Sequence, residues 1–292
     1  MAKTDDLLPL SAPLAWQWAS QLCRKDPATG EDCSHVHAIW QYLRLMGMLG
    51  TFEPRRDFYL NAMQTITGAG GAPPVLISGA ADYAMLDFVY TAFRSRGIVA
   101  KIMVSDLCET PLALNRWYAE RASFPIMTVR CDIMEFVTDA PFDAMCTDAL
   151  ITRFPASRRG ALVDKWSSLL RAGGKVITAA RLRPASDPEQ IRFSTEQVEK
   201  LRATVAHAAH ETRAIFGVDP DELAARAATY AANYVTHAVY AAEEVRALFE
   251  DHGFGISHLA AKNAAENGAH GAHNRSIRGD AKRYLTVVAS RL

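Results

Sequence analysis

Three apolar runs in this sequence each end in a residue that suits a nucleoside-containing ligand. Gly79 follows "PVLIS", Asp106 follows "AKIMVS" and Asp132 follows "PIMTVRC". A glycine permits a positive φ and lets the backbone approach a ligand closely. A carboxylate at a strand end can accept hydrogen bonds from the two hydroxyls of a ribose. A carboxylate at the end of the next strand can accept a hydrogen bond from the amino group of adenine. Together these residues indicate a cofactor site at one edge of a sheet.

The turn after the first run is small throughout. Ala80 and Ala81 follow Gly79, and a helix expected from Asp82 would point its N-terminal amides at the ligand. Two alternatives remain open: a tight strand-to-helix turn that binds nothing, and Asp106 acting only as the cap of its following helix.

A second set of residues could act on an acceptor. Thr147 and Asp148 end the fourth apolar run, where Asp148 could serve as a base, as a substrate orienter or as the cap of the next turn. Tyr230, Tyr234 and His237 are spaced i, i+4 and i+7, which predicts one helix face. That face is either an aromatic packing stripe or a substrate wall with His237 as proton acceptor.

Near the N-terminus, "CSHVHAIWQY" offers further candidates. His37 and Tyr42 are assigned to the substrate side of the site, with Tyr42 packing over the cleft or in a helical core. Cys33, His35 and His37 fit no standard zinc spacing, so no metal is expected. The five cysteines are odd in number and scattered without a C-x-x-C pair, which argues against a disulfide framework or a cysteine-rich zinc site.

Short apolar runs alternating with amphipathic stretches must position these residues. We expect strands at 74–79, 100–106, 125–132, 142–148, 174–182, 255–262 and 283–290, with helices near 82–96, 110–122 and 157–171. Such alternation implies right-handed crossovers and a mostly parallel sheet covered on both faces. The fold class is therefore α/β: a seven-stranded, doubly wound, Rossmann-like domain over residues 73–292.

Two helical additions interrupt this pattern. Residues 1–72 form an expected N-terminal cap, and an insert at about 185–241 precedes the sixth strand. Within the insert, Ser194 and Gln197 have the spacing of a capping box, and Asp219 before Pro220 signals a second helix start. Both additions should lie at the carboxyl ends of the strands, where ligands bind in this architecture. A polar surface loop is expected between the last two strands.

The constellation resembles the class I S-adenosylmethionine-dependent methyltransferases, over roughly residues 73–182 and 243–291. Besides the three strand-end residues, the resemblance rests on "FD" at 142–143, "LLRAGGKV" and "EEVRALFEDHGFGI". It implies a methyl transfer to a small-molecule acceptor by in-line displacement, with S-adenosyl-L-methionine as the cofactor. The residues it assigns to the cofactor are Gly79, Ala80, Ala81, Asp106, Leu107, Asp132, Ile133 and Thr147.

The first motif departs from that family at three positions. Ile77 stands where an acidic residue is common, and Ala81 and Tyr83 stand where further glycines occur. These departures leave open a catalytically silent cofactor-binding module on the same fold. An NAD(P)-dependent oxidoreductase is the remaining alternative, but it calls for G-x-G-x-x-G, and "GAADYA" supplies only the first glycine.

Composition restricts the partners. Lys plus Arg equals Asp plus Glu at 32 each, so no charge excess favours a nucleic acid. The sequence shows neither a secretory signal nor an apolar stretch long enough to span a membrane. We therefore expect a cytoplasmic protein with a small-molecule partner, whose apolar N-terminal helices leave room for a homodimer.

Overall fold

A seven-stranded sheet forms the centre of the computed structural model, which describes residues 4–23, 25–26, 31–49, 53–67, 71–211, 217–263 and 283–292. In chain order the strands are β3 (Pro74–Ser78), β4 (Lys101–Asp106), β5 (Met127–Arg130), β6 (Phe142–Asp148), β7 (Leu170–Leu182), β10 (Phe254–Asn263) and β11 (Arg283–Arg291). The spatial order is β10-β11-β7-β6-β3-β4-β5. Only β11 runs antiparallel to its neighbours within this sheet. The expected doubly wound, mostly parallel sheet is confirmed.

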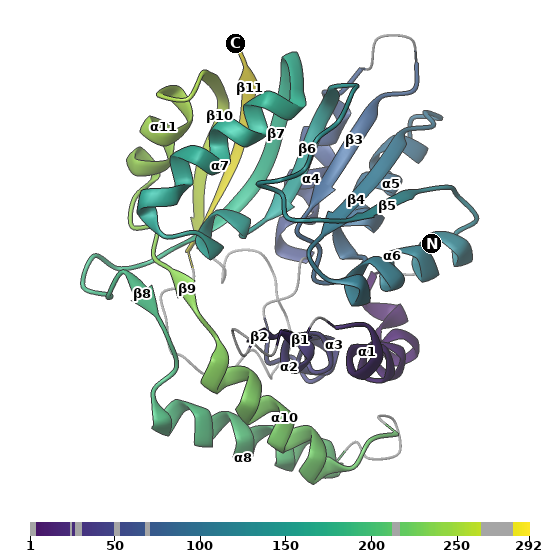
Figure 1. Ribbon diagram of the computed structural model, residues 1–292, viewed down its shortest axis with the longest axis vertical. Helices are drawn as coiled ribbons and strands as arrows, with labels where there is room; N and C mark the ends of the chain where they lie inside the picture. Colours follow the sequence, from purple (N-terminus) through teal and green to yellow (C-terminus); the bar gives the residue numbers. More distant parts are fainter. Residues whose placement is uncertain are drawn as a thin grey trace.

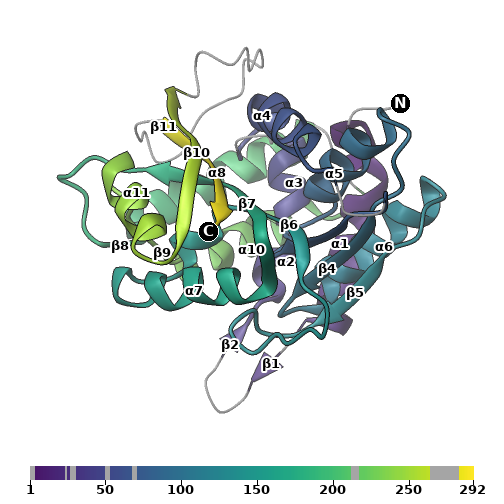
Figure 2. The ribbon, with the colours of Figure 1, turned by 90° about the horizontal axis from the view of Figure 1, so that it is seen from above.

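Helices cover both faces of the sheet (Figure 2). On one face lie α4 (Glu53–Gln64), α5 (Ala84–Arg94) and α6 (Glu109–Arg121), and on the other lie α7 (Ala156–Leu169) and α11 (Ala242–Glu250). Each face has its own apolar core, because strands buried on both sides carry apolar residues at nearly every position.

One boundary differs from the expectation. The helix expected to run to residue 171 ends at Leu169, and β7 begins at Leu170 rather than after the glycine pair. Leu170 pairs with Phe142 across the sheet, and the Leu170 carbonyl accepts a hydrogen bond from Arg291. Pairing with β6 therefore determines the conformation of Leu170, although the local sequence pattern is helical.

The two helical additions share one core. The N-terminal addition contains α1 (Leu8–Leu22), preceded by η1 (Thr4–Leu7), then α2 (Ser34–His37) and α3 (Trp40–Leu45); the insert contains α8 (Thr195–Glu211) and α10 (Pro220–Asn233). Ile39 and Leu43 pack in one buried cluster with Leu201 and Leu223, although the two segments are far apart in the sequence. Figure 1 shows these helices together below the sheet. They form a helical layer at the end where β7 leaves the sheet toward the insert.

The capping signals of the insert are confirmed. Ser194 and Gln197 exchange hydrogen bonds of 2.9 and 3.2 Å between side chain and backbone, as a capping box requires. The Asp219 carboxylate accepts from the amides of Asp221 and Glu222. These caps satisfy amides that the first turn of each helix leaves without a partner.

The predicted continuation of α10 through His237 is wrong. The helix ends at Asn233, whose side chain donates to the Thr229 carbonyl at 2.9 Å. The β-branched Val235 and Thr236 follow, and β9 (Thr236–His237) pairs antiparallel with β8 (Gln190–Ile191). A short strand pair thus separates His237 from the helix that carries the tyrosines.

The polar loop expected after Asn263, with His270 and His273, lies outside the described residues. Among the helices that are described, none is long and apolar enough to cross a membrane.

Candidate functional site

The turn after β3 requires a glycine. Gly79 has φ +71°, and its amide donates to the Ser105 carbonyl at 2.9 Å. A Cβ at this position would lie 3.1 Å from a methyl group of Leu150. The backbone angle therefore strains any residue that has a side chain, and the Leu150 methyl group would have to shift slightly to admit one. The glycine itself is exposed at the carboxyl edge of the sheet.

Asp106 links the turns after β3 and β4. Its Oδ2 accepts from the Ala80 amide at 2.9 Å, and its Oδ1 accepts from the Cys108 amide at 2.8 Å. Burial raises the pKa of Asp106 to about 6, although the two amides that donate to it act in the opposite direction. Each carboxylate oxygen has a second lone pair, so the group can still accept from ligand hydroxyls.

A cavity of about 250 Å³ lies at the ends of β4 and β5. It is lined by Leu107, Arg130, Cys131, Asp132 and Glu135. Leu107 is 53% exposed there, an unusual position for an apolar side chain. The cavity therefore offers one apolar surface and several hydrogen-bonding groups, a combination that suits a purine ring.

Asp132 and Ile133, both assigned to the cofactor, lie in the turn after β5. The Asp132 carboxylate accepts from the Met134 amide at 2.9 Å, which shapes the turn after β5. Ile133 is buried in the apolar core below that turn. Asp132 thus borders the cavity, whereas Ile133 supports its floor.

Asp82 does not start the helix that was expected there. The helix α5 begins at Ala84, and Asp82 accepts from the Ala84 amide at 2.9 Å. The same carboxylate forms an ion pair with Arg44 of α3, and both side chains are 1% exposed. Sequence patterns gave no signal for this pair. It ties the N-terminal helices to the turn after β3.

Core packing accounts for the departures at Ile77 and Tyr83. Ile77 lies in the middle of the sheet, paired with Val104, and is 1% exposed. The Tyr83 ring stacks on that of Tyr118 at 5.0 Å, and its hydroxyl is 3.0 Å from the Ser11 hydroxyl of α1. Side chains that serve the core therefore occupy both positions.

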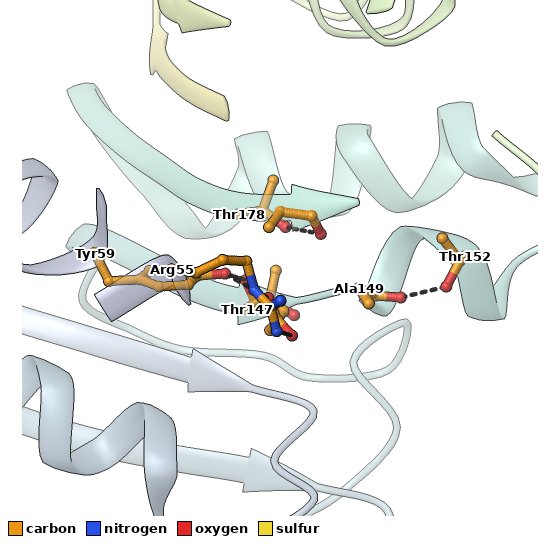
Figure 3. Close-up of polar contacts among 8 residues, drawn as sticks. Arg55, Tyr59, Thr147, Ala149, Thr152 and Thr178 are labelled. Carbon is orange, nitrogen blue, oxygen red and sulfur yellow. Dashed lines mark hydrogen bonds and ion pairs between the residues drawn. The ribbon is translucent and has the colours of Figure 1, made fainter. Parts of the chain in front are cut away.

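Asp148, at the carboxyl end of β6, forms an ion pair with Arg55. Figure 3 shows Arg55 and Tyr59 beside Thr147, the residue before Asp148. The Arg55 guanidinium of α4 donates to both carboxylate oxygens of Asp148, at 3.0 and 2.9 Å. The Tyr59 hydroxyl lies 2.9 Å from Asp148 Oδ1 and also 2.9 Å from the Thr147 carbonyl. Arg55 and Tyr59 are spaced i, i+4 on one helix, but nothing in the sequence linked them to β6.

Thr147 has a buried hydroxyl. Its side chain is 1% exposed, and its Oγ1 has no hydrogen-bond partner within the described residues. The next residue but one, Ala149, adopts φ +56°, and its carbonyl accepts from the Thr152 hydroxyl at 2.7 Å (Figure 3). A non-glycine residue at positive φ stores strain, and such strain is commonly found at functional sites.

The expected aromatic wall is divided between two elements. Tyr230 is buried, and its ring lies 5.6 Å from that of Tyr234 and 6.5 Å from that of Phe193. Tyr234 is half-buried just beyond the helix. These contacts place both tyrosines in the helical layer, as a packing stripe would require.

His237 lies nearer the sheet. It is half-buried in β9, which packs on the turn that follows β6. Arg153 of that turn donates to the Val235 carbonyl at 2.8 Å. Burial lowers the pKa of His237, and the nearby Arg159 charge lowers it further. Both effects favour the neutral ring, the form that can accept a proton.

The two N-terminal candidates differ in their surroundings. Tyr42 is fully buried, and its ring meets that of Trp16 at 5.9 Å within the helical core. His37 lies near Asp106 instead, with its Nδ1 3.3 Å from Cys23 Sγ. The structure therefore separates them: Tyr42 packs inside the helical layer, and His37 faces the sheet.

No family model and no curated protein matches this sequence. Solved structures do match. The cyclase SpnF aligns with a TM-score of 0.52 at 13% identity, covering 98% of this chain and 94% of its own. Geranyl diphosphate methyltransferase, solved with S-adenosylmethionine, aligns with a TM-score of 0.50 at 12% identity, covering 91% and 93%. TehB from Haemophilus influenzae has a TM-score of 0.50 at 10% identity, covering 81% and 62%.

At these identities the likeness concerns the fold. The seven-stranded, mostly parallel sheet agrees with the fold expected from the sequence resemblance. The chain thus has the fold of the class I S-adenosylmethionine-dependent methyltransferases.

Proposed function

We propose that this chain binds S-adenosyl-L-methionine at the carboxyl edge of β3, β4 and β5 and transfers its methyl group to a small-molecule acceptor. The observation that carries the proposal is Asp106. Its carboxylate accepts from the amide of Ala80, next to the exposed Gly79, and the following residue, Leu107, lines the cavity. Each oxygen retains a lone pair for a ribose hydroxyl. Neighbours of the same fold are described as methyltransferases, one of them in complex with this cofactor.

Different residues along this edge would bind different parts of the cofactor. Asp106 would orient the ribose, and Asp132 and Leu107 would contact the adenine in the cavity. The bound cofactor supplies an electrophilic methyl group on a sulfonium. The exposed Gly79 backbone would contact the remainder of the ligand, and the Thr147 hydroxyl would do so from below the surface.

Acceptor-side roles are proposed for two residues. His237, whose neutral form burial favours, would accept a proton from the acceptor. Asp148 is held by Arg55 in a bidentate ion pair, which favours a positioning role over that of a base. The helical layer of α1–α3, α8 and α10 would limit access and so favour a small acceptor (Figure 1).

A second candidate is a protein of this fold that binds the cofactor without transferring the methyl group. A fold does not fix a reaction, and one neighbour is described as a cyclase. The three departures at and near the turn after β3 favour this candidate, because they remove residues that commonly bind the methionine end of the cofactor in the family.

Calorimetric titration separates these candidates in two stages. The wild type is titrated with S-adenosylmethionine, S-adenosylhomocysteine and NAD(P) in turn, and then Asp106→Asn is titrated with the first two. Losing the charged acceptor should weaken binding about 10- to 100-fold, because hydrogen bonds to charged groups contribute about 1.5–3 kcal/mol. Asp251→Asn, on the exposed end of α11, makes the same chemical change away from the site and should leave affinity unchanged.

The second stage measures transfer from methyl-labelled cofactor to metabolite pools. Labelled product, together with binding that depends on Asp106, supports the methyltransferase. Binding without any labelled product supports the silent module. No binding at millimolar cofactor would refute both candidates, and binding of NAD(P) instead would favour an oxidoreductase.

A further inference from the structure

Four potential metal ligands converge between α1, α2 and α6. Cys23 is the C-cap residue of α1, and Cys108 is the N-cap residue of α6. Cys33 directly precedes α2, and His37 is the last residue of that helix. Their three sulfurs and one ring nitrogen all lie within 4.8 Å of one another. The set therefore joins the N-terminal helices to the strand-end turn that contains Asp106.

Two distances within this set are close to those of tetrahedral zinc. Zn–S bonds of about 2.3 Å and Zn–N bonds of about 2.05 Å place two sulfurs about 3.8 Å apart, and a sulfur and a nitrogen about 3.6 Å apart. The structure has 3.6 Å between the sulfurs of Cys23 and Cys108, and 3.3 Å between Cys23 Sγ and His37 Nδ1. Three cysteines and one histidine are a known closed ligand set for structural zinc.

A disulfide and simple apolar packing both fit these contacts less well than a metal does. A disulfide would require sulfurs about 2.05 Å apart, and all five cysteines are free. Buried cysteine often behaves as a small hydrophobe, but apolar packing does not call for an imidazole nitrogen directed at a sulfur. The buried neighbours Ala19 and Ala38 are small and leave the three thiols in mutual contact.

The local structure holds the ligands in place. Strands β1 (Lys25–Asp26) and β2 (Glu31–Asp32) pair as a hairpin, which brings Cys23 and Cys33 together. The Asp32 carboxylate accepts from the Ser34 amide at 2.8 Å and so fixes the start of α2.

The surroundings also favour a thiolate-rich centre. The Thr110 hydroxyl lies 3.2 Å from Cys23 Sγ, within reach to donate to a thiolate. A zinc ion with three thiolates and a neutral imidazole carries one net negative charge. The positive end of the 13-residue helix α6, whose N-cap residue is Cys108, stabilises such a charge.

We propose that Cys23, Cys33, His37 and Cys108 bind one structural zinc ion. Binding displaces the thiol protons and leaves three thiolates on the metal. Cys108 would then hold the metal through its sulfur while its amide holds Asp106 at 2.8 Å. The ion would fix the N-terminal helices to the edge of the sheet, and this assignment stands whether or not the chain transfers methyl groups.

The test begins with the untagged full chain purified under reducing conditions. Mass spectrometry of its metal content should find about one zinc per chain. Replacement by cobalt(II) should give the visible absorption of a tetrahedral site and a thiolate-to-cobalt charge-transfer band. Reduced protein that binds neither zinc nor cobalt after reconstitution would overturn the proposal, and so would stoichiometric iron or copper in place of zinc.

Variants then identify the ligands. Loss of a residue that only hydrogen-bonds to a metal ligand weakens metal binding by roughly 10- to 100-fold. Cys33→Ser and Cys108→Ser each remove a ligand itself, so each should weaken zinc binding by more than that. Cys131→Ser, outside the cluster, should retain the full zinc content. His37→Cys should keep the metal and strengthen the charge-transfer band, which tests the assignment even if a serine variant fails to fold. Full zinc retention in both serine variants would refute it.

Discussion

The ion pair between Arg44 and Asp82 allows one prediction to be worked in detail. Asp82→Asn removes the charge that faces Arg44 but keeps an oxygen that can accept from the Ala84 amide. The substitution therefore tests the ion pair rather than the helix cap. It leaves the Arg44 guanidinium buried between α3 and the turn after β3, where its former partner no longer neutralises it.

The expected cost follows from burial. Both side chains are 1% exposed, so water cannot replace the lost partner. Removing one member of a buried ion pair costs about 3–5 kcal/mol. At about 2–4 °C per kcal/mol for chains approaching this size, the melting temperature should fall by about 6–20 °C. The double variant Arg44→Met/Asp82→Asn removes both charges and should recover part of that loss.

Urea unfolding followed by circular dichroism provides the measurement. Glu250→Gln serves as the control, because Glu250 and its partner Arg246 are each about half exposed, at 49% and 48%. Breaking such a pair should cost less than about 1 kcal/mol. A loss below about 1 kcal/mol for Asp82→Asn, or additive effects in the double variant, would show that the ion pair does not hold the helical layer to the turn.

Three further predictions concern the carboxyl edge. Gly79→Ala should lose at least about 1–2 kcal/mol in urea unfolding, because its φ of +71° is strained for any side chain; wild-type stability would contradict this. Thr147→Val should leave unfolding unchanged or stabilise the fold by up to about 1 kcal/mol, since its buried hydroxyl lacks a partner in the described chain. The same variant should weaken cofactor binding in calorimetry, and unaltered affinity would remove Thr147 from the site. Asp148→Asn should destabilise by about 3 kcal/mol because it removes the charge that faces the buried Arg55, whereas Tyr59→Phe should cost about 1 kcal/mol; equal losses would mean that the ion pair contributes little.

Sequence patterns predicted the sheet well because the signals for strands and helices are local. The strand over 142–148 was predicted with its observed bounds, and Asp106 ends β4 as expected. Errors arose where pairing with a distant segment overrode the local pattern. Leu170 joined β7 because it pairs with Phe142, and His237 left the helical face because β9 pairs with β8.

For the candidate site, the sequence predicted the positions of the strand-end residues but not the contacts between distant segments. Gly79, Asp106 and Asp132 could be located because the carboxyl ends of neighbouring parallel strands meet at one edge. Arg55 was missed because its helix is distant in sequence from Asp148 and packs on the sheet only in the folded chain. The cysteine cluster was missed for the same reason, since Cys108 joins Cys23 and Cys33 from another part of the chain.

The positions of the strands along the chain and the residues at their ends followed from the amino-acid pattern alone, because apolar runs alternating with helical stretches are local signals. Which charges and thiols face one another became apparent only in the folded chain. Arg44 meets Asp82, Arg55 meets Asp148, and four potential metal ligands meet at the edge of the sheet. The physical reason is that strand and helix formation depends on neighbours along the chain, whereas these contacts depend on how separate helices pack against the finished sheet.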